Sequence, residues 1–254
     1  MVSSVDSSAS LVSRAGALTD SSRPLLTFYD DATGERTALS ASELGDWAAR
    51  VAGLLTSGCG LGPGSRAAVL LPPHWQTAAA LLGAWSAGVA VSFRLSATAG
   101  LPTLGPGLDE PLDAVFVSRG QLDDWLVDVP AATHRFLFTV GDEKRPVATP
   151  DGYQEFLPSL SGFAGSSSVL LYPTDPASVD GTTYAQWGSL AHWVATDAGL
   201  AAGDRLLVDA AEHEHPLKWL LAPLSVGASV VLCANLDKSL IESRVAAEGV
   251  TRVL

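Results

Sequence analysis

Residues 61–93 read L-G-P-G-S-R-A-A-V-L-L-P-P-H-W-Q-T-A-A-A-L-L-G-A-W-S-A-G-V-A-V-S-F, and this stretch decides the fold class. Gly62-Pro63-Gly64 is a turn sequence, and the apolar run over 66–71 predicts a short strand that two prolines end. Apolar residues on one face predict a helix over 74–87. A glycine follows, and the largely apolar run over 89–93 predicts the next strand. Strand, helix and strand at this spacing predict a parallel βαβ unit.

The chain before this unit predicts a hairpin and a capped helix. The runs 25–29 and 36–39 are strand candidates separated by turn residues. Ser40 and Glu43 stand three positions apart, the spacing of a capping box, in which each side chain satisfies a free amide at the helix start. An apolar face then continues to about residue 58.

The chain after the unit repeats the alternation of strand and helix. Strands are predicted over 113–117, 136–140, 169–172, 206–208 and 250–254, and helices over 121–127, 184–200, 217–226 and 237–248. The fold class is therefore α/β, with a layered, mostly parallel sheet flanked by helices. Residues 1–22 are polar and small and are expected to be disordered or loosely ordered. A Gly/Ser-rich linker favours a first subdomain over 23–162 and a second over 163–254.

Composition excludes several classes of function. The 254 residues carry a formal net charge of -12, and an acidic surface disfavours both nucleic acid and anionic lipid as partners. No apolar run reaches the ~18 residues that a membrane span needs, and the N-terminus lacks the pattern of a secretory signal. Two distant cysteines, Cys59 and Cys233, favour a reduced, cytoplasmic protein.

Several fragments stand in an order that resembles one enzyme superfamily. They are L-S-A-S-E-L at 39–44, L-G-P-G-S-R-A-A-V at 61–69, A-W-S-A-G-V at 84–89, G-D-R at 203–205 and G-A-S-V-V-L at 227–232. Their order is similar to the N-terminal domain of the acyl-adenylate-forming enzymes, the AMP-dependent synthetase and ligase superfamily. The chain also resembles a short actinobacterial family of AMP-binding-enzyme-like proteins of unknown function. The resemblance implies part of that N-terminal domain, with a truncated second subdomain.

The phosphate loop of that superfamily, Y-T-S-G-T-T-G-x-P-K-G, is replaced at 171–183 by L-Y-P-T-D-P-A-S-V-D-G-T-T. The two prolines remove amide donors, the two aspartates carry charge of the wrong sign for phosphate, and no lysine lies between Lys144 and Lys218. We therefore expect no cofactor, neither ATP nor AMP. The resemblance places a degenerate phosphate site at Thr174, Gly181, Thr182 and Thr183. We predict instead an ordered turn in which Thr182 or Thr183 caps the helix that follows, with no amides converging on an anion site.

Glu212-His213-Glu214-His215 is the most polar cluster of the second half. In an extended chain His213 and His215 project to one face, as a metal-binding pair would, whereas the alternative is a solvated loop. The resemblance implies that a histidine here lines a substrate pocket, together with Tyr172. With no third ligand identifiable, no metal is expected.

These observations predict a non-catalytic binding or interaction protein, with no catalytic residues, that takes an unidentified small molecule. The alternative is an enzyme, or half of a split acyl-adenylating ligase completed by a partner chain. In the superfamily that the chain resembles, the sheet would continue beyond the position of the last residue. A homodimer or a protein partner is therefore expected to cover the C-terminal edge of the sheet.

Overall fold

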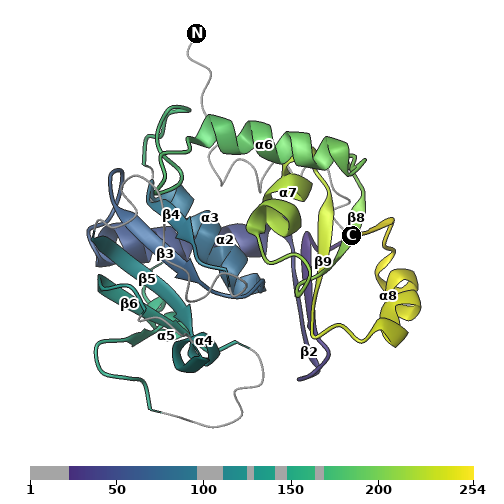
Figure 1. The fold of residues 1–254 in the computed structure, drawn as a ribbon, viewed down its shortest axis with the longest axis horizontal. Helices are drawn as coiled ribbons and strands as arrows, with labels where there is room; N and C mark the ends of the chain where they lie inside the picture. Colours follow the sequence, from purple (N-terminus) through teal and green to yellow (C-terminus); the bar gives the residue numbers. More distant parts are fainter. Residues whose placement is uncertain (1–22, 96–110, 125–128, 141–147, 164–168) are drawn as a thin grey trace.

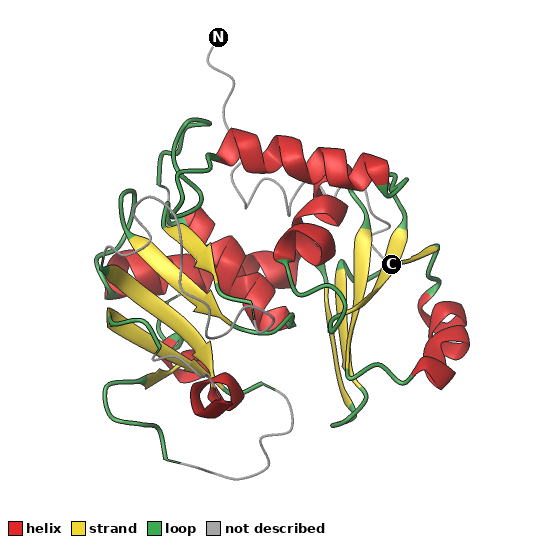
Figure 2. Ribbon diagram, in the orientation of Figure 1, coloured by secondary structure: helices red, strands yellow, loops and turns green. Residues whose placement is uncertain are grey.

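The computed structural model describes residues 23–95, 111–124, 129–140, 148–163 and 169–254, which form two five-stranded sheets with helices between and outside them (Figures 1 and 2). The strands are β1 (Leu26–Asp30), β2 (Glu35–Leu39), β3 (Arg66–Leu70), β4 (Ala90–Phe93), β5 (Leu112–Ser118), β6 (Ala132–Phe138), β7 (Gln154–Glu155), β8 (Arg205–Asp209), β9 (Ser229–Ala234) and β10 (Arg252–Val253). The α-helices are α2 (Ala41–Gly53), α3 (Trp75–Ser86), α4 (Arg119–Asp124), α5 (Phe156–Ser159), α6 (Tyr184–Asp197), α7 (Ala222–Val226) and α8 (Ile241–Glu248). Shorter turns are η1 (Leu54–Gly58), η3 (Leu217–Leu221) and η4 (Lys238–Leu240).

The first sheet has the strand order β10-β8-β9-β1-β2 and the second has β4-β3-β5-β6-β7. Neighbouring strands are parallel except for the predicted hairpin of β1 and β2, which is antiparallel with Leu26 opposite Leu39. The α/β class with mostly parallel sheets flanked by helices is therefore confirmed.

The elements stack in five layers. The two sheets face each other across α2, α3, α6 and α7, and these helices share one core with the inner faces of both sheets (Figure 1). On the outer face of the β3–β7 sheet, Leu122 of α4 packs against a second cluster that contains Val115 and Val117. On the outer face of the other sheet, Val245 of α8 packs against a third cluster that contains Leu207 and Val231.

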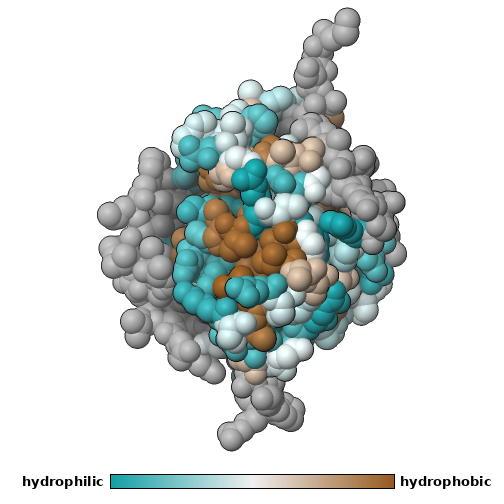
Figure 3. Space-filling model, turned by 90° about the vertical axis from the view of Figure 1, so that its right-hand side faces the viewer, coloured by the Kyte–Doolittle hydropathy of each residue, from teal (hydrophilic) through white to brown (hydrophobic). Residues whose placement is uncertain are grey.

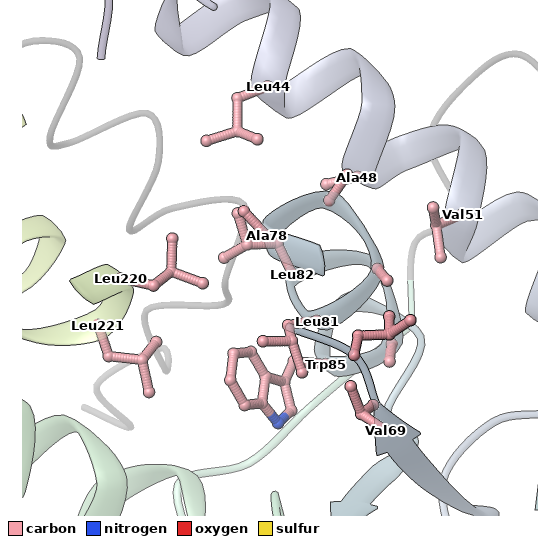
Figure 4. Close-up of a cluster of buried hydrophobic side chains, with 14 of the residues drawn as sticks. Leu44, Ala48, Val51, Val69, Ala78, Leu81, Leu82, Trp85, Leu220 and Leu221 are labelled. Atoms are coloured by element: carbon pink, nitrogen blue, oxygen red, sulfur yellow. The ribbon is translucent and has the colours of Figure 1, made fainter. Parts of the chain in front are cut away.

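Helix α3 lies at the centre of the molecule, and its residues from Gln76 to Trp85 are all buried. Figure 4 shows side chains of α2, α3, β3 and η3 meeting around it. The helices α2 and α3 approach most closely at Gly83, where an added Cβ would lie 2.4 Å from the Cβ of Val51 and 2.7 Å from the carbonyl oxygen of Ala48. A side chain at this position would force the helices apart.

The predicted capping box is confirmed. The Ser40 hydroxyl accepts the Glu43 amide at 3.2 Å, and the Glu43 carboxylate accepts the Ser40 amide at 2.8 Å. The strand predicted over 169–172 is wrong. Leu170 is 73% exposed, and the Tyr172 amide donates to the Asp175 carboxylate at 2.8 Å, which closes a turn.

Other boundaries differ from the prediction. The helix predicted over 121–127 is α4, which starts at Arg119, and residues 125–127 lie outside the described ranges, as does the segment 1–22. The predicted division at 162/163 does not coincide with the division between sheets, because β1 and β2 join the sheet that β8, β9 and β10 complete. As a boundary between subdomains it stays a prediction.

The side of the molecule that carries α8 and β10 has an apolar area on its surface (Figure 3). The exposed large apolar side chains of this region are Leu240, Val253 and Leu254. β10 is the last strand of its sheet and pairs with β8 alone among the described strands. Within the described residues, no helix has the length and apolarity needed to cross a membrane.

Candidate functional site

A cleft of about 220 Å³ opens between the two sheets, at the carboxyl ends of their strands. It is lined by Phe28, Asp30, Pro72, Pro73, His74, Val140, Ala210, Ala211, Glu214, Ala234 and Asn235. These residues come from the ends of β1, β8 and β9, from the β3–α3 connection, and from the chain that follows β6. Ligands of open α/β sheets bind in this position, because the connections that leave the strands converge there.

Asp30 is the less exposed of the two carboxylate residues that line the cleft, at 2% exposed. Its Oδ1 accepts the Ala32 amide at 2.9 Å and the Asn235 side-chain amide at 2.8 Å. Asn235 has a φ of +48°, in the left-handed region that asparagine adopts more readily than most residues other than glycine. Two strand ends that are 205 positions apart in the chain are thus held together at the cleft wall.

His74, in the β3–α3 connection, contributes a ring to the lining of the cleft. It caps α3, with its Nδ1 accepting the Gln76 amide at 3.1 Å, and its ring meets the Phe28 ring edge-on at 4.3 Å between centroids. Its Nε2 lies 3.6 Å from a Glu35 carboxylate oxygen, to which the Trp75 indole donates at 3.1 Å. The His74 imidazole, more than the Trp75 indole, holds the pKa of Glu35 below its usual value.

The segment from Tyr172 to Tyr184 is an ordered turn held by hydrogen bonds between its own backbone groups. The amides of Ala177 and Ser178 donate to the Thr182 carbonyl at 2.9 and 3.1 Å, and the Tyr184 amide donates to the Asp175 carbonyl at 3.1 Å. The same segment extends the neighbouring sheet, because the Val91 amide donates to the Ala177 carbonyl at 3.0 Å. The expected ordered turn is confirmed.

The four residues predicted for a degenerate phosphate site have different roles in this turn. Thr174 is exposed, and Gly181 has a φ of +87° in the turn itself. The Thr182 amide donates to the Asp180 carboxylate at 3.0 Å. Thr183 is the N-cap of α6 and forms a capping box with Gln186, as predicted for one of the two threonines. Nothing in the structure tests phosphate binding by this group.

The predicted pocket residues lie outside the lining of the cleft. Tyr172 is 48% exposed on the surface. His215 stacks on the Trp187 ring at 5.8 Å and contacts the Phe93 ring at 5.1 Å, and burial lowers its pKa. The pKa of His213 is also lowered, by burial first and then by Lys218. Among the described residues, no group of three or more potential ligands could hold a metal ion.

Of the polar residues that line the cleft, Asp30, His74 and Asn235 were not predicted from the sequence, and Glu214 was named only as a member of the polar cluster at 212–215. A signal was present for three of them. Asp30 and Asn235 each follow an apolar strand, and His74 follows the prolines that end another. Because carboxyl ends of parallel strands share one edge, polar residues at these positions are expected to converge.

Comparison with known proteins places the chain among sequences of the same length and among longer enzymes of the same fold. It is 35% identical over 237 residues to a "TIGR03089 family protein" of Mycobacterium tuberculosis, with 91% of each chain covered. A model of the family "AMP-binding enzyme" matches residues 15–99.

Solved structures share the fold at low sequence identity. They include an acyl-CoA synthetase of Brucella canis (18% identity, TM-score 0.68) and an anthranilate CoA ligase, AuaEII, in complex with anthranoyl-AMP (15% identity, TM-score 0.69). The matches cover 95% and 98% of this chain but 49% of each enzyme, so the chain spans about half the length of these structural neighbours. The fold is that of the N-terminal domain of adenylate-forming enzymes.

Proposed function

This chain belongs to the TIGR03089 family, and we propose that it is a non-catalytic protein that binds a small molecule on the scaffold of an adenylate-forming enzyme. The proposed binding site is the cleft between the two sheets, which lies where ligands of open α/β sheets bind. No adenylation step is assigned to the chain.

The observation that carries this proposal is the hydrogen bonding of the segment 172–184, in which nine of the eleven amides donate to acceptors among the described residues and those of Thr174 and Asp180 are the exceptions. A loop that binds the phosphates of ATP must offer free amides and a cation to the negative charge that gathers there. In this segment the amides of Tyr172, Asp175, Ala177, Ser178, Val179, Gly181, Thr182, Thr183 and Tyr184 all donate to acceptors within the protein. Pro173 and Pro176 have no amide to offer, and Asp175 and Asp180 add negative charge. These residues do not fit a triphosphate.

Pyrophosphate exchange tests the proposal directly. The purified chain, incubated with ATP, labelled pyrophosphate and a panel of aliphatic, aromatic and amino carboxylic acids, is expected to give no exchange above a heat-denatured control. Calorimetric titration with ATP and AMP is expected to give no heat of binding. Robust exchange with any acid would show that the segment opens onto phosphate and would refute the non-catalytic function.

A second candidate is half of a split acyl-adenylating ligase, favoured by the apolar surface beside β10. An edge strand with exposed apolar neighbours is a ready site for another chain to add a strand. On this reading a partner chain would cover Leu240, Val253 and Leu254. The two candidates are distinguished by repeating the exchange assay with the chain purified from its native host together with its bound proteins. Exchange by the complex but not by the isolated chain supports the split ligase.

A further inference from the structure

The Asp30 carboxylate is buried without a basic partner. Its Oδ1 accepts two neutral amide donors, while its Oδ2 makes no hydrogen bond in the part of the chain that the structure describes. The adjacent Asp31 differs, since the Arg244 guanidinium contacts both of its carboxylate oxygens, at 2.6 and 3.1 Å. A buried carboxylate is costly unless a cation or further hydrogen-bond donors compensate it.

The rest of the cleft offers no strongly basic side chain to balance Asp30. None of the described residues that line the cleft is a lysine or an arginine. A ligand that carries phosphate or carboxylate would therefore meet charge of its own sign.

The remaining lining favours an apolar body of limited size. Pro72, Pro73, Val140 and the alanines present hydrocarbon, and Phe28 presents an aromatic ring. Rings of this kind attract cations as well as apolar groups. The volume of about 220 Å³ is below the roughly 300–1,000 Å³ of pockets that hold drug-sized ligands.

We infer that the cleft binds a small organic cation, a primary ammonium on a short apolar body, whose nitrogen donates to Asp30 and whose body lies against the prolines and Phe28. The inference rests on the proposed function, because it assigns a ligand class to the same cleft. This ligand class differs from a phosphate, because the described lining has a buried carboxylate and no lysine or arginine to balance an anion.

Binding of simple amines tests the inference. n-Butylammonium, cyclohexylammonium and phenethylammonium are titrated into the full chain by calorimetry, beside the corresponding alcohols and carboxylates of the same carbon skeletons. Saturable binding is expected for at least one amine, with its alcohol and carboxylate partners about tenfold weaker or worse. Equal binding of a carboxylate, or of a divalent metal chloride alone, would overturn the assignment.

Three variants identify the site. Asp30→Asn keeps the shape of the side chain and is expected to weaken amine binding about tenfold or more. Asp151→Asn removes the same charge from an exposed residue outside the cleft and is expected to leave the affinity unchanged. Ala211→Phe fills the cleft from an exposed position of its lining, so it blocks the ligand even if Asp30→Asn fails to fold. Unchanged affinity in Ala211→Phe refutes the location.

The outcomes separate the two proposals. Pyrophosphate exchange would refute the non-catalytic function whatever the amines do. Saturable binding of a neutral or anionic probe in the cleft, lost in Ala211→Phe and with no response to amines, would refute the cation and leave the binding function standing.

Discussion

Glu248 ties helix α8 to the sheet beneath it, and its replacement by glutamine is expected to destabilise the fold strongly. The carboxylate accepts from the Arg205 guanidinium at 2.6 Å, from Arg36 at 2.9 Å and from the Tyr29 hydroxyl at 2.5 Å. Arg205 is 1% exposed and reaches the Pro24 carbonyl and the Thr27 hydroxyl with its other donors. Neutralising Glu248 leaves that guanidinium buried without its counter-charge.

The size of the effect follows from the pKa of the carboxyl group. Burial alone would raise it, but the hydrogen bonds from Tyr29, Arg36 and Arg205 outweigh burial and hold the pKa of Glu248 at about 2, against 4.5 for a free glutamate. Each pKa unit corresponds to about 1.4 kcal/mol, so the charged form stabilises the fold by about 3 kcal/mol. Removing one partner of a buried ion pair costs roughly 3–5 kcal/mol, which agrees.

The sign of the pH dependence follows from the same values. Because the folded pKa lies below the unfolded one, the stabilisation is fully present above about pH 4.5 and is lost as the pH falls towards 2. The assay is urea unfolding followed by tryptophan fluorescence at pH 7, 5, 4 and 3. Glu248→Gln is expected to lose about 3 kcal/mol at pH 7 and to show a flatter decline below pH 5 than the parent chain.

The matched control is Glu242→Gln, the same chemical change at an exposed position of the same helix, which is expected to alter stability by less than about 0.5 kcal/mol. A Glu248→Gln variant that loses less than about 1 kcal/mol at pH 7 and keeps the decline of the parent below pH 5 would refute the reasoning.

Three further outcomes are expected. Gly83→Ala should lower the free energy of unfolding by about 1–3 kcal/mol, because the new Cβ would lie 2.4 Å from the Cβ of Val51. The change is measured by urea unfolding, and a loss below about 0.5 kcal/mol would contradict the close packing of α2 on α3. Thr183→Ala should cost about 1 kcal/mol, since its hydroxyl accepts the Gln186 amide at 3.3 Å, and Thr183→Ser should restore most of it in the same assay. Cys233 is 0% exposed and burial raises its pKa to about 11, so its alkylation by iodoacetamide at pH 8, read by peptide mass spectrometry apart from that of the half-buried Cys59, should require urea; rapid labelling of Cys233 in the native chain would show that the α8 face opens.

The features that were predicted correctly from the sequence depend on residues that lie close together in the chain. The capping box of Ser40 and Glu43 and the cap at Thr183 depend on residues three positions apart, so the spacing alone predicts them. The alternation of apolar runs with helical faces was sufficient to predict parallel sheets, because a crossover helix is the usual way to join parallel strands.

The strand predicted over 169–172 shows where local reasoning fails. Leu170 and Leu171 have the composition of a strand, but none of the described strands pairs with them, and the Asp175 carboxylate accepts the Tyr172 amide instead. A strand is stable only when it pairs with another strand, and the local sequence does not show which strand will lie beside it.

The sequence by itself thus determined the class of the fold and the N-caps of α2 and α6, since both depend on periodicity and on contacts between near neighbours. The tertiary structure alone decided that β1 pairs with β9 and that Asp30 meets Asn235 across 205 positions at the wall of a cleft. Such contacts are fixed by the packing of the whole core, which brings strand ends together irrespective of their distance along the chain.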